Sequence, residues 1–199
     1  METTSKSAAA PYAVAPGEAA QAIVKAAGVS AEGSKLLEPN DKPQNYLDRL
    51  LTAGKGEDVV RFLAYVLPKR EAIWWVWVCA RKSAGAAPNS ETKTVLDAVE
   101  RWIVQPTDTH RRTAFAMAEM TDIGTPAGCA AVALFFAGGS IAPPDVAEVL
   151  PPSGMTEKAV VNGIALAVAA DPDHMPERWA DFARMGMEVA DRIKLWGGA

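Results

Sequence analysis

Residue types that could support covalent or metal chemistry are scarce in this sequence. The chain holds two cysteines, Cys79 and Cys129, and two histidines, His110 and His174. Both cysteines lie in apolar runs, whereas a reactive cysteine needs surroundings that stabilise its thiolate. We interpret both as buried structural thiols in a reducing compartment, with a single disulfide as the alternative. Two histidines are too few for a His-rich metal site.

Two short polar motifs could bind an ion. Asp171, Asp173 and His174 could form a mixed metal site, but the same residues suit a capped turn before Pro176, which we favour. The Gly-Gly-Ser run at 138–140 has the composition of an anion-binding loop. It follows a predicted helix rather than a strand and lacks the Lys and Ser/Thr of a phosphate loop. We therefore predict a helix end and a chain reversal there.

A cationic cluster lies near a predicted helix start at His110, Arg111 and Arg112. The helix dipole disfavours positive charge at that end. We predict a solvated face for these three residues, with a partner contact as the alternative.

The polar residues best placed for binding are Lys69, Arg70 and Glu71, because they lie directly against a tryptophan cluster that includes Trp74 and Trp77. Arg70 or Glu71 could form a structural pair that orients the helix, or the rim of a groove with a tryptophan floor. Tryptophan is enriched at binding hot spots, but it is also a large core residue. No catalytic residue, metal ligand or cofactor is predicted.

These residues belong to a helix that the sequence predicts to be central. Between Glu71 and Arg81 no residue is charged, and apolar side chains fall on both helical faces. A helix that is apolar all round must be covered on both sides. This apolar segment is too short for a membrane span, which takes roughly 20 residues.

Helical stripes elsewhere group into four successive pairs, at residues 44–66, 69–105, 109–137 and 156–195. The small-residue run from Ala127 to Ala137 is predicted to pack on the Trp-rich helix. No segment shows the two-residue alternation of a strand. We predict an all-α fold, an irregular bundle of antiparallel helix pairs, with a HEAT-like curved helical stack as the alternative.

Length and composition set the domain organisation. The 199 residues fit a single domain. We predict a flexible N-terminal arm at 1–16 and one helical domain at 17–199, of which 17–42 is loosely attached. The net charge of −4 without a basic block argues against nucleic acid as a partner. The N-terminus has no hydrophobic signal region, so we expect a cytoplasmic protein.

Two stretches carry a family resemblance, residues 58–75 and 125–144. The first combines leucine-proline, a basic pair, glutamate and a double tryptophan, and the second joins Gly-Gly-Ser to Pro-Pro. Over roughly residues 40–195 the chain resembles an uncharacterised family of bacterial all-helical proteins, a domain of unknown function. The resemblance implies no catalytic residues. It implies an association with type VI secretion gene clusters, as an accessory or adaptor component.

We therefore predict a non-enzymatic cytoplasmic protein-interaction module, an adaptor or chaperone-like factor that binds another protein through a helical groove. One alternative is a small-ligand-binding protein or an enzyme, with a pocket between the Trp-rich helix and the Gly-Gly-Ser loop. Arg70, Glu71 and Ser140 would supply the polar groups of that pocket. The other alternative is a self-associating scaffold.

Overall fold

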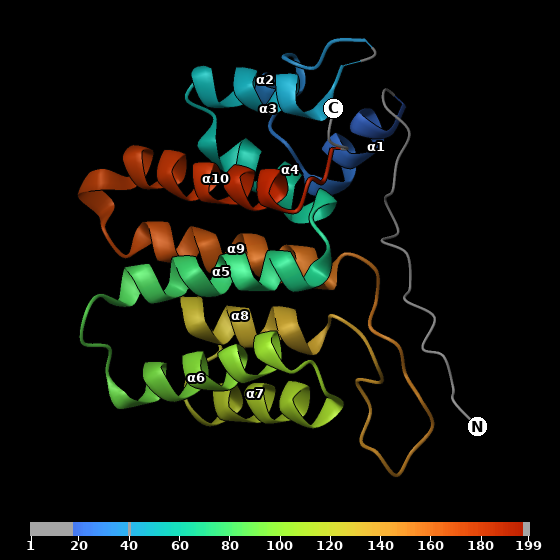
Figure 1. Cartoon of the computed structure of the whole chain (residues 1–199), viewed down its shortest axis with the longest axis vertical. Helices are drawn as coiled ribbons and strands as arrows, with labels where there is room; N and C mark the ends of the chain where they lie inside the picture. Colours follow the sequence, from blue (N-terminus) through green and yellow to red (C-terminus); the bar gives the residue numbers. More distant parts are fainter. Residues whose placement is uncertain (1–17, 40, 197–199) are drawn as a thin grey trace.

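The computed structural model describes residues 18–39 and 41–196, and every regular element in these ranges is helical (Figure 1). The predicted arm at 1–16 lies outside the described residues. The all-α prediction is confirmed, and no described helix is both long and apolar enough to cross a membrane. The helices are α1 (Glu18–Ala27), α2 (Ala31–Ser34), α3 (Pro43–Thr52), α4 (Gly56–Val66), α5 (Lys69–Ala84), α6 (Ser90–Val104), α7 (Asp108–Met120), α8 (Pro126–Phe135), α9 (Met155–Ala169) and α10 (Met175–Arg192), with a 3₁₀ turn at Pro172–His174.

The helix boundaries follow the capping chemistry of the sequence. The Thr125 hydroxyl accepts a hydrogen bond from the Gly128 amide at 3.0 Å, and Pro126 is the first residue of α8. Thr107 caps α7 in the same way by accepting the His110 amide at 3.2 Å. The four predicted pairs correspond to α3–α4, α5–α6, α7–α8 and α9–α10.

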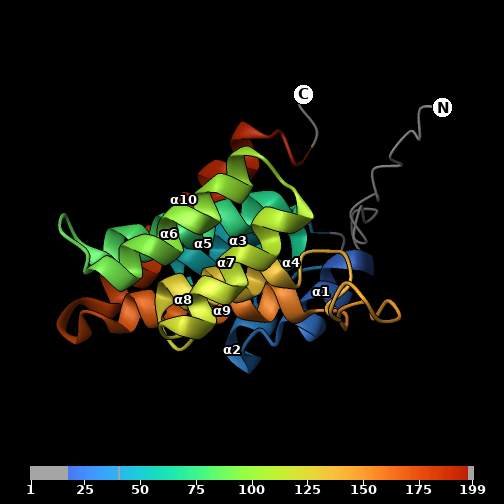
Figure 2. The ribbon, with the colours of Figure 1, turned by 90° about the horizontal axis from the view of Figure 1, so that it is seen from below.

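Helix α5 lies at the centre of the bundle, as its all-round apolar surface predicts. It packs against α6, α8, α9 and α10, and the two ribbon views place these helices around it (Figures 1 and 2). Its side chains from Ala72 to Ala80 are mostly buried. The predicted contact between α5 and α8 is confirmed, although α8 packs most extensively against α9.

Trp75 connects α5 to α10 through a hydrogen bond and close packing on a glycine. The side chain is fully buried, and its indole N–H donates to the Phe182 carbonyl at 2.9 Å. A Cβ atom on Gly186 would lie 2.6 Å from Trp75 Cζ2, so only glycine lets α10 approach the ring this closely. The largest side chain of the core therefore packs on a glycine of α10, which the sequence did not predict.

The segment before α3 is held by buried polar contacts that its loop-like composition did not indicate. Asp58 of α4 is buried and accepts hydrogen bonds from the Ser30 amide at 2.8 Å and the Ser30 hydroxyl at 2.6 Å. The Tyr46 hydroxyl donates to the Gly33 carbonyl at 3.1 Å. Burial, together with the nearby Asp58 carboxylate, raises the pKa of Tyr46 to about 12. These contacts join Ser30 and Gly33, within the segment 17–42 that was predicted to be loosely attached, to α4 and α3.

Candidate functional site

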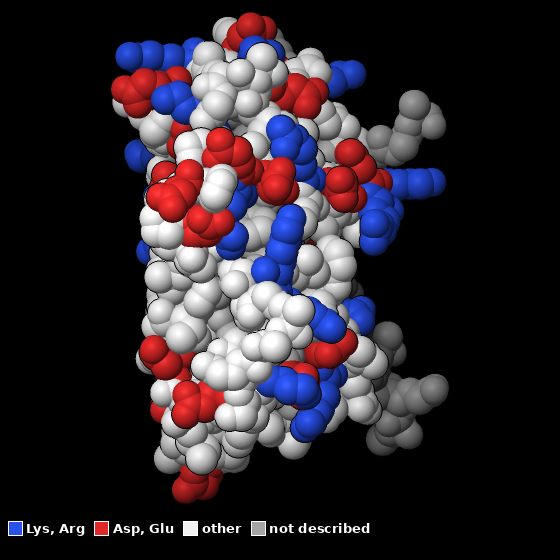
Figure 3. Space-filling model, turned by 90° about the vertical axis from the view of Figure 1, so that its left-hand side faces the viewer, with Lys and Arg blue, Asp and Glu red and all other residues white. Residues whose placement is uncertain are grey.

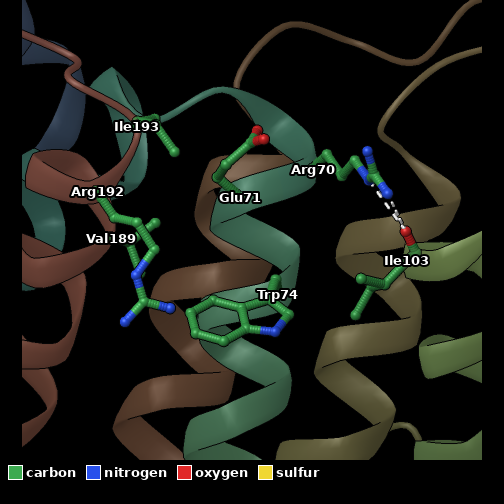
Figure 4. Close-up of a pocket in the computed structure, with 7 residues that line it drawn as sticks. All are labelled: Arg70, Glu71, Trp74, Ile103, Val189, Arg192 and Ile193. Atoms are coloured by element: carbon green, nitrogen blue, oxygen red, sulfur yellow. Dashed lines mark hydrogen bonds between the residues drawn. The ribbon is translucent and has the colours of Figure 1, made fainter.

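A groove lies where the first turn of α5 meets the last turns of α6 and α10 (Figure 4). Its volume is about 260 Å³. Its walls come from the consecutive helices α5 and α6 and from the distant helix α10, so local sequence patterns could not indicate the α10 side. The residues that line the groove are Arg70, Glu71, Trp74, Ile103, Val189, Arg192 and Ile193.

Trp74 is the half-buried aromatic surface of this groove. Its indole lies between the α10 wall and the α6 wall (Figure 4). Trp77, the other tryptophan predicted for the site, is buried elsewhere. Its indole N–H donates to the Leu96 carbonyl at 2.9 Å, and the Arg81 guanidinium lies 5.3 Å from its ring. Trp77 therefore joins α5 to α6 and does not line the groove.

Arg70 forms the α6 wall by binding the end of that helix. Its Nε and Nη2 atoms donate to the Ile103 carbonyl at 3.0 and 2.5 Å. A cation near the C-terminal carbonyls of a helix is favoured by the dipole. No other acceptor among the described residues binds the exposed guanidinium, so Arg70 combines a structural contact with an open binding group.

Two charged side chains of the groove have no charged partner within the described part of the chain. Glu71 is half-buried on the first turn of α5, and Arg192 is exposed on the last turn of α10. Neither forms a hydrogen bond or an ion pair with another described side chain. Figure 4 shows the Arg192 guanidinium beside Trp74 and the Glu71 carboxylate turned away from it. The groove can therefore pair with charges on a partner without first breaking an internal ion pair.

Lys69 and Ser140, also predicted site residues, do not line the groove. Lys69 donates to the Ala137 carbonyl at 3.2 Å, just after the end of α8. The Ser140 hydroxyl accepts the amides of Ala142 and Val149, each at 3.1 Å. Ser140 thus closes the long loop between α8 and α9. The hollow beside Arg70 and Glu71 opens toward α10 instead of toward the Gly-Gly-Ser loop.

Arg111 overturns the prediction of a solvated cationic face. Its side chain is only 4% exposed, and it donates to the Phe135 carbonyl at 2.6 Å and to the Ser140 carbonyl at 2.7 Å. Its guanidinium also lies 4.8 Å from the Phe135 ring. Arg111 thus caps the C-terminal end of α8 from α7. Hydrogen bonds from Arg112 and Arg111 hold the pKa of Asp108 below its ordinary value.

The cysteines and histidines do not form a reactive cluster. Burial raises the pKa of the Cys79 thiol, and burial together with the nearby Asp122 charge raises that of Cys129. Both are free thiols, and Cys129 is half-buried rather than buried as predicted. His174 is exposed and lies 3.1 Å from Asp171 Oδ1. No group of three metal-ligating side chains occurs among the residues that the structure describes.

A second hollow, of about 500 Å³, was not anticipated from the sequence. It lies between the α1–α2 connection, the α3–α4 connection and the starts of α4 and α10. Asp58 in its lining binds Ser30 and Arg61 pairs with Glu57 at 2.7 Å, whereas Glu32 and Lys55 form no ion pair with another described residue. Acidic and basic side chains are also mixed over the side of the molecule shown in Figure 3. Most of the residues that line this hollow are polar, charged or glycine, whereas the groove beside Trp74, called the Trp74 groove below, has apolar side chains on both walls.

Comparison with known proteins supplies a family. The model of a family of unknown function (DUF6931) matches residues 46–190. The chain belongs to this family. The DUF6931 match begins in α3 and ends at Ala190 of α10, so it includes Trp74 but stops before Arg192. It confirms the predicted resemblance to an uncharacterised domain. No curated protein and no solved structure matches the chain.

Proposed function

We propose that this DUF6931 protein is a non-enzymatic protein-interaction module, an adaptor or chaperone-like factor that binds its partner in the Trp74 groove. The observation that carries the proposal is the half-buried Trp74 between Arg70 and Arg192, in a groove with unpaired charges. Tryptophan and arginine are the side chains most enriched at binding hot spots. Apolar residues on both walls would exclude water from a bound side chain.

The size of the groove favours a protein side chain over a cofactor or a substrate. Pockets for small molecules usually measure about 300–1,000 Å³, whereas this groove measures about 260 Å³ and is open. Ser140, which the ligand-binding alternative requires, is occupied in closing its own loop. These observations weigh against the small-ligand or enzyme alternative.

The cellular setting of the proposal comes from the sequence resemblance. We propose a cytoplasmic, bacterial protein that serves as an accessory component of a type VI secretion system. A partner would then be another protein of the same secretion machinery. Membership of DUF6931, a family of unknown function, is compatible with this role.

Self-association is a second candidate function, and one surface supports it. Val146, Val149 and Leu150 lie in the loop between α8 and α9 and are 56%, 49% and 66% exposed. An exposed apolar cluster often marks a protein–protein contact. Sedimentation of the native chain and of a Leu150→Ser variant over a range of concentrations tests this candidate. If the native chain stays monomeric at every concentration, as the variant should, self-association is contradicted.

Photo-crosslinking tests the main proposal. A photoreactive amino acid replaces Ile193, which lines the groove, and in a matched control it replaces Met120, which is 78% exposed on α7. We expect one protein to be captured by the native chain and crosslinked from position 193 only. Equal crosslinking from both positions, or capture unaffected by the folded double variant Arg192→Glu/Trp74→Ala, would contradict the proposal.

A further inference from the structure

The charges of the Trp74 groove indicate the chemistry of the segment that it binds. Its lining contains two guanidinium groups and one carboxylate, which gives a local charge of +1 from two positive charges minus one negative. The whole chain carries a net charge of −4. The groove is therefore a positive site on an acidic protein, and it should attract a segment that the remaining surface repels.

The two guanidinium groups lie on different walls. Arg70 is held on the α6 side by its hydrogen bonds to the Ile103 carbonyl, and Arg192 extends from α10 toward Trp74 (Figure 4). A chain that crosses the Trp74 ring from one wall to the other meets a guanidinium on each side. Arginine suits carboxylates because its planar fork can donate two parallel hydrogen bonds.

We propose that the groove binds an acidic segment of a partner protein in which carboxylates flank a large apolar side chain. The apolar side chain lies on Trp74, between the aliphatic side chains of Ile103 and Val189, and the flanking carboxylates pair with Arg70 and Arg192. This inference rests on the proposed function and adds the chemistry of the partner. A volume of about 260 Å³ accommodates one such anchor side chain.

Glu71 restricts where the carboxylates of the segment can lie. It is half-buried on the first turn of α5, where the helix dipole favours a negative charge. A carboxylate placed directly over Glu71 is repelled, whereas a main-chain N–H there gains an acceptor. Glu71→Gln is therefore expected to strengthen the binding of acidic peptides by about two- to fivefold.

A peptide-display selection tests the inference without assuming its result. Short random peptides are selected on the native full chain, and the affinities of the selected peptides are measured by fluorescence anisotropy. The same peptides are then measured with Arg192→Glu and Trp74→Ala, after circular dichroism confirms that each variant is folded. Arg184→Glu is the matched control, because Arg184 is an exposed arginine of the same helix outside the groove.

The expected peptides carry Asp or Glu on both sides of a large apolar residue. Their affinity should fall about tenfold in Arg192→Glu, change by less than about twofold in Arg184→Glu, and weaken as salt is added. Neutral or basic peptides that depend on Trp74 would overturn the acidic chemistry and leave the binding function standing. If no selected peptide depends on Trp74 or Arg192, both the inference and the proposed function fail.

Discussion

Two arginines of this fold bind the ends of neighbouring helices, yet their surroundings differ. Arg111 caps α8 through the Phe135 carbonyl, and Arg70 binds the end of α6 through the Ile103 carbonyl. The Arg111 side chain is 4% exposed and pairs with Asp108, whereas Arg70 is exposed. The closed arrangement, at Arg111, pairs its charges within the chain. The open arrangement, at Arg70, leaves guanidinium donors for a partner. An arginine at a helix end is thus a structural cap or a binding group, depending on what covers it.

The largest expected effect is the loss of the closed cap. Arg111→Ala removes the side-chain donor of the Phe135 carbonyl and one of the two arginine donors of the Ser140 carbonyl, and should lower the free energy of unfolding by about 3 kcal/mol. Arg70→Ala should cost less than about 1 kcal/mol, because water can replace the exposed guanidinium. Urea unfolding followed by circular dichroism measures both. Equal losses would show that the two sites do not differ as described, and Arg111→Lys provides an intermediate case if the alanine variant fails to fold.

The second largest effect is expected in the buried part of the α5–α10 interface, where Trp75 packs on Gly186. The groove beside Trp74 is the open part of the same interface. Gly186→Ala places a Cβ atom 2.6 Å from the Trp75 ring, which is fixed by its hydrogen bond to Phe182. Overpacking, partly offset by better helix propensity, should cost about 1–2 kcal/mol. Gly138→Ala is the control, because no atom lies within 4 Å of its added Cβ. An unchanged melting temperature in Gly186→Ala would contradict the tight packing.

A smaller effect, of opposite sign, is expected at the end of α10. The chain turns after α8 at Gly139, with φ of +71°, but after α10 it turns at Lys194, with φ of +54°. Lysine is strained in this left-handed conformation, and glycine is not. Lys194→Gly should therefore raise the free energy of unfolding by about 0.5–1 kcal/mol. Thermal unfolding measures this gain, and a fall in the melting temperature would show that the lysine is not strained.

The smallest effect concerns acid. Because the folded chain holds the pKa of Asp108 below its ordinary value of 3.8, the carboxylate stabilises the fold above that pH. The contribution is lost as the pH falls through the lowered pKa. Native protein should therefore be more stable than Asp108→Asn near neutral pH, and the difference should shrink below 3.8. A difference in urea midpoint that grows as the pH falls would contradict this sign.

The helices could be predicted from the sequence because their signals are local. Proline and threonine at the starts of α5 and α8, and apolar stripes within each segment, depend only on neighbouring residues. The α5 half of the groove, Arg70, Glu71 and Trp74, could be predicted for the same reason. Its other wall, from Val189 to Ile193, could not, because nothing in the α5 pattern indicates which distant helix lies beside Trp74.

The wrong predictions for Trp77 and Arg111 have the same physical origin, because both depend on which other segments of the chain cover these side chains. Trp74 and Trp77 share one helical face in the sequence, but α6 covers Trp77, whereas Trp74 stays open toward α10. Arg111 looked solvated because its partners, the end of α8 and Ser140, come more than twenty residues later. The sequence did hold a signal for this cap. The last turn of α8 has no basic residue and is soon followed by Gly138 and Gly139, so the free carbonyls at its end require donors from elsewhere in the chain.

The affinity of Trp74→Ala for the captured partner tests most directly whether the open groove is the binding site. The partner affinities of native protein, Trp74→Ala and the control Arg184→Glu are compared, with unfolding measured in parallel. We predict that Trp74→Ala loses about 2 kcal/mol of binding free energy while the chain stays folded, as expected for a hot spot. Native affinity in a folded Trp74→Ala variant would contradict the proposed binding site.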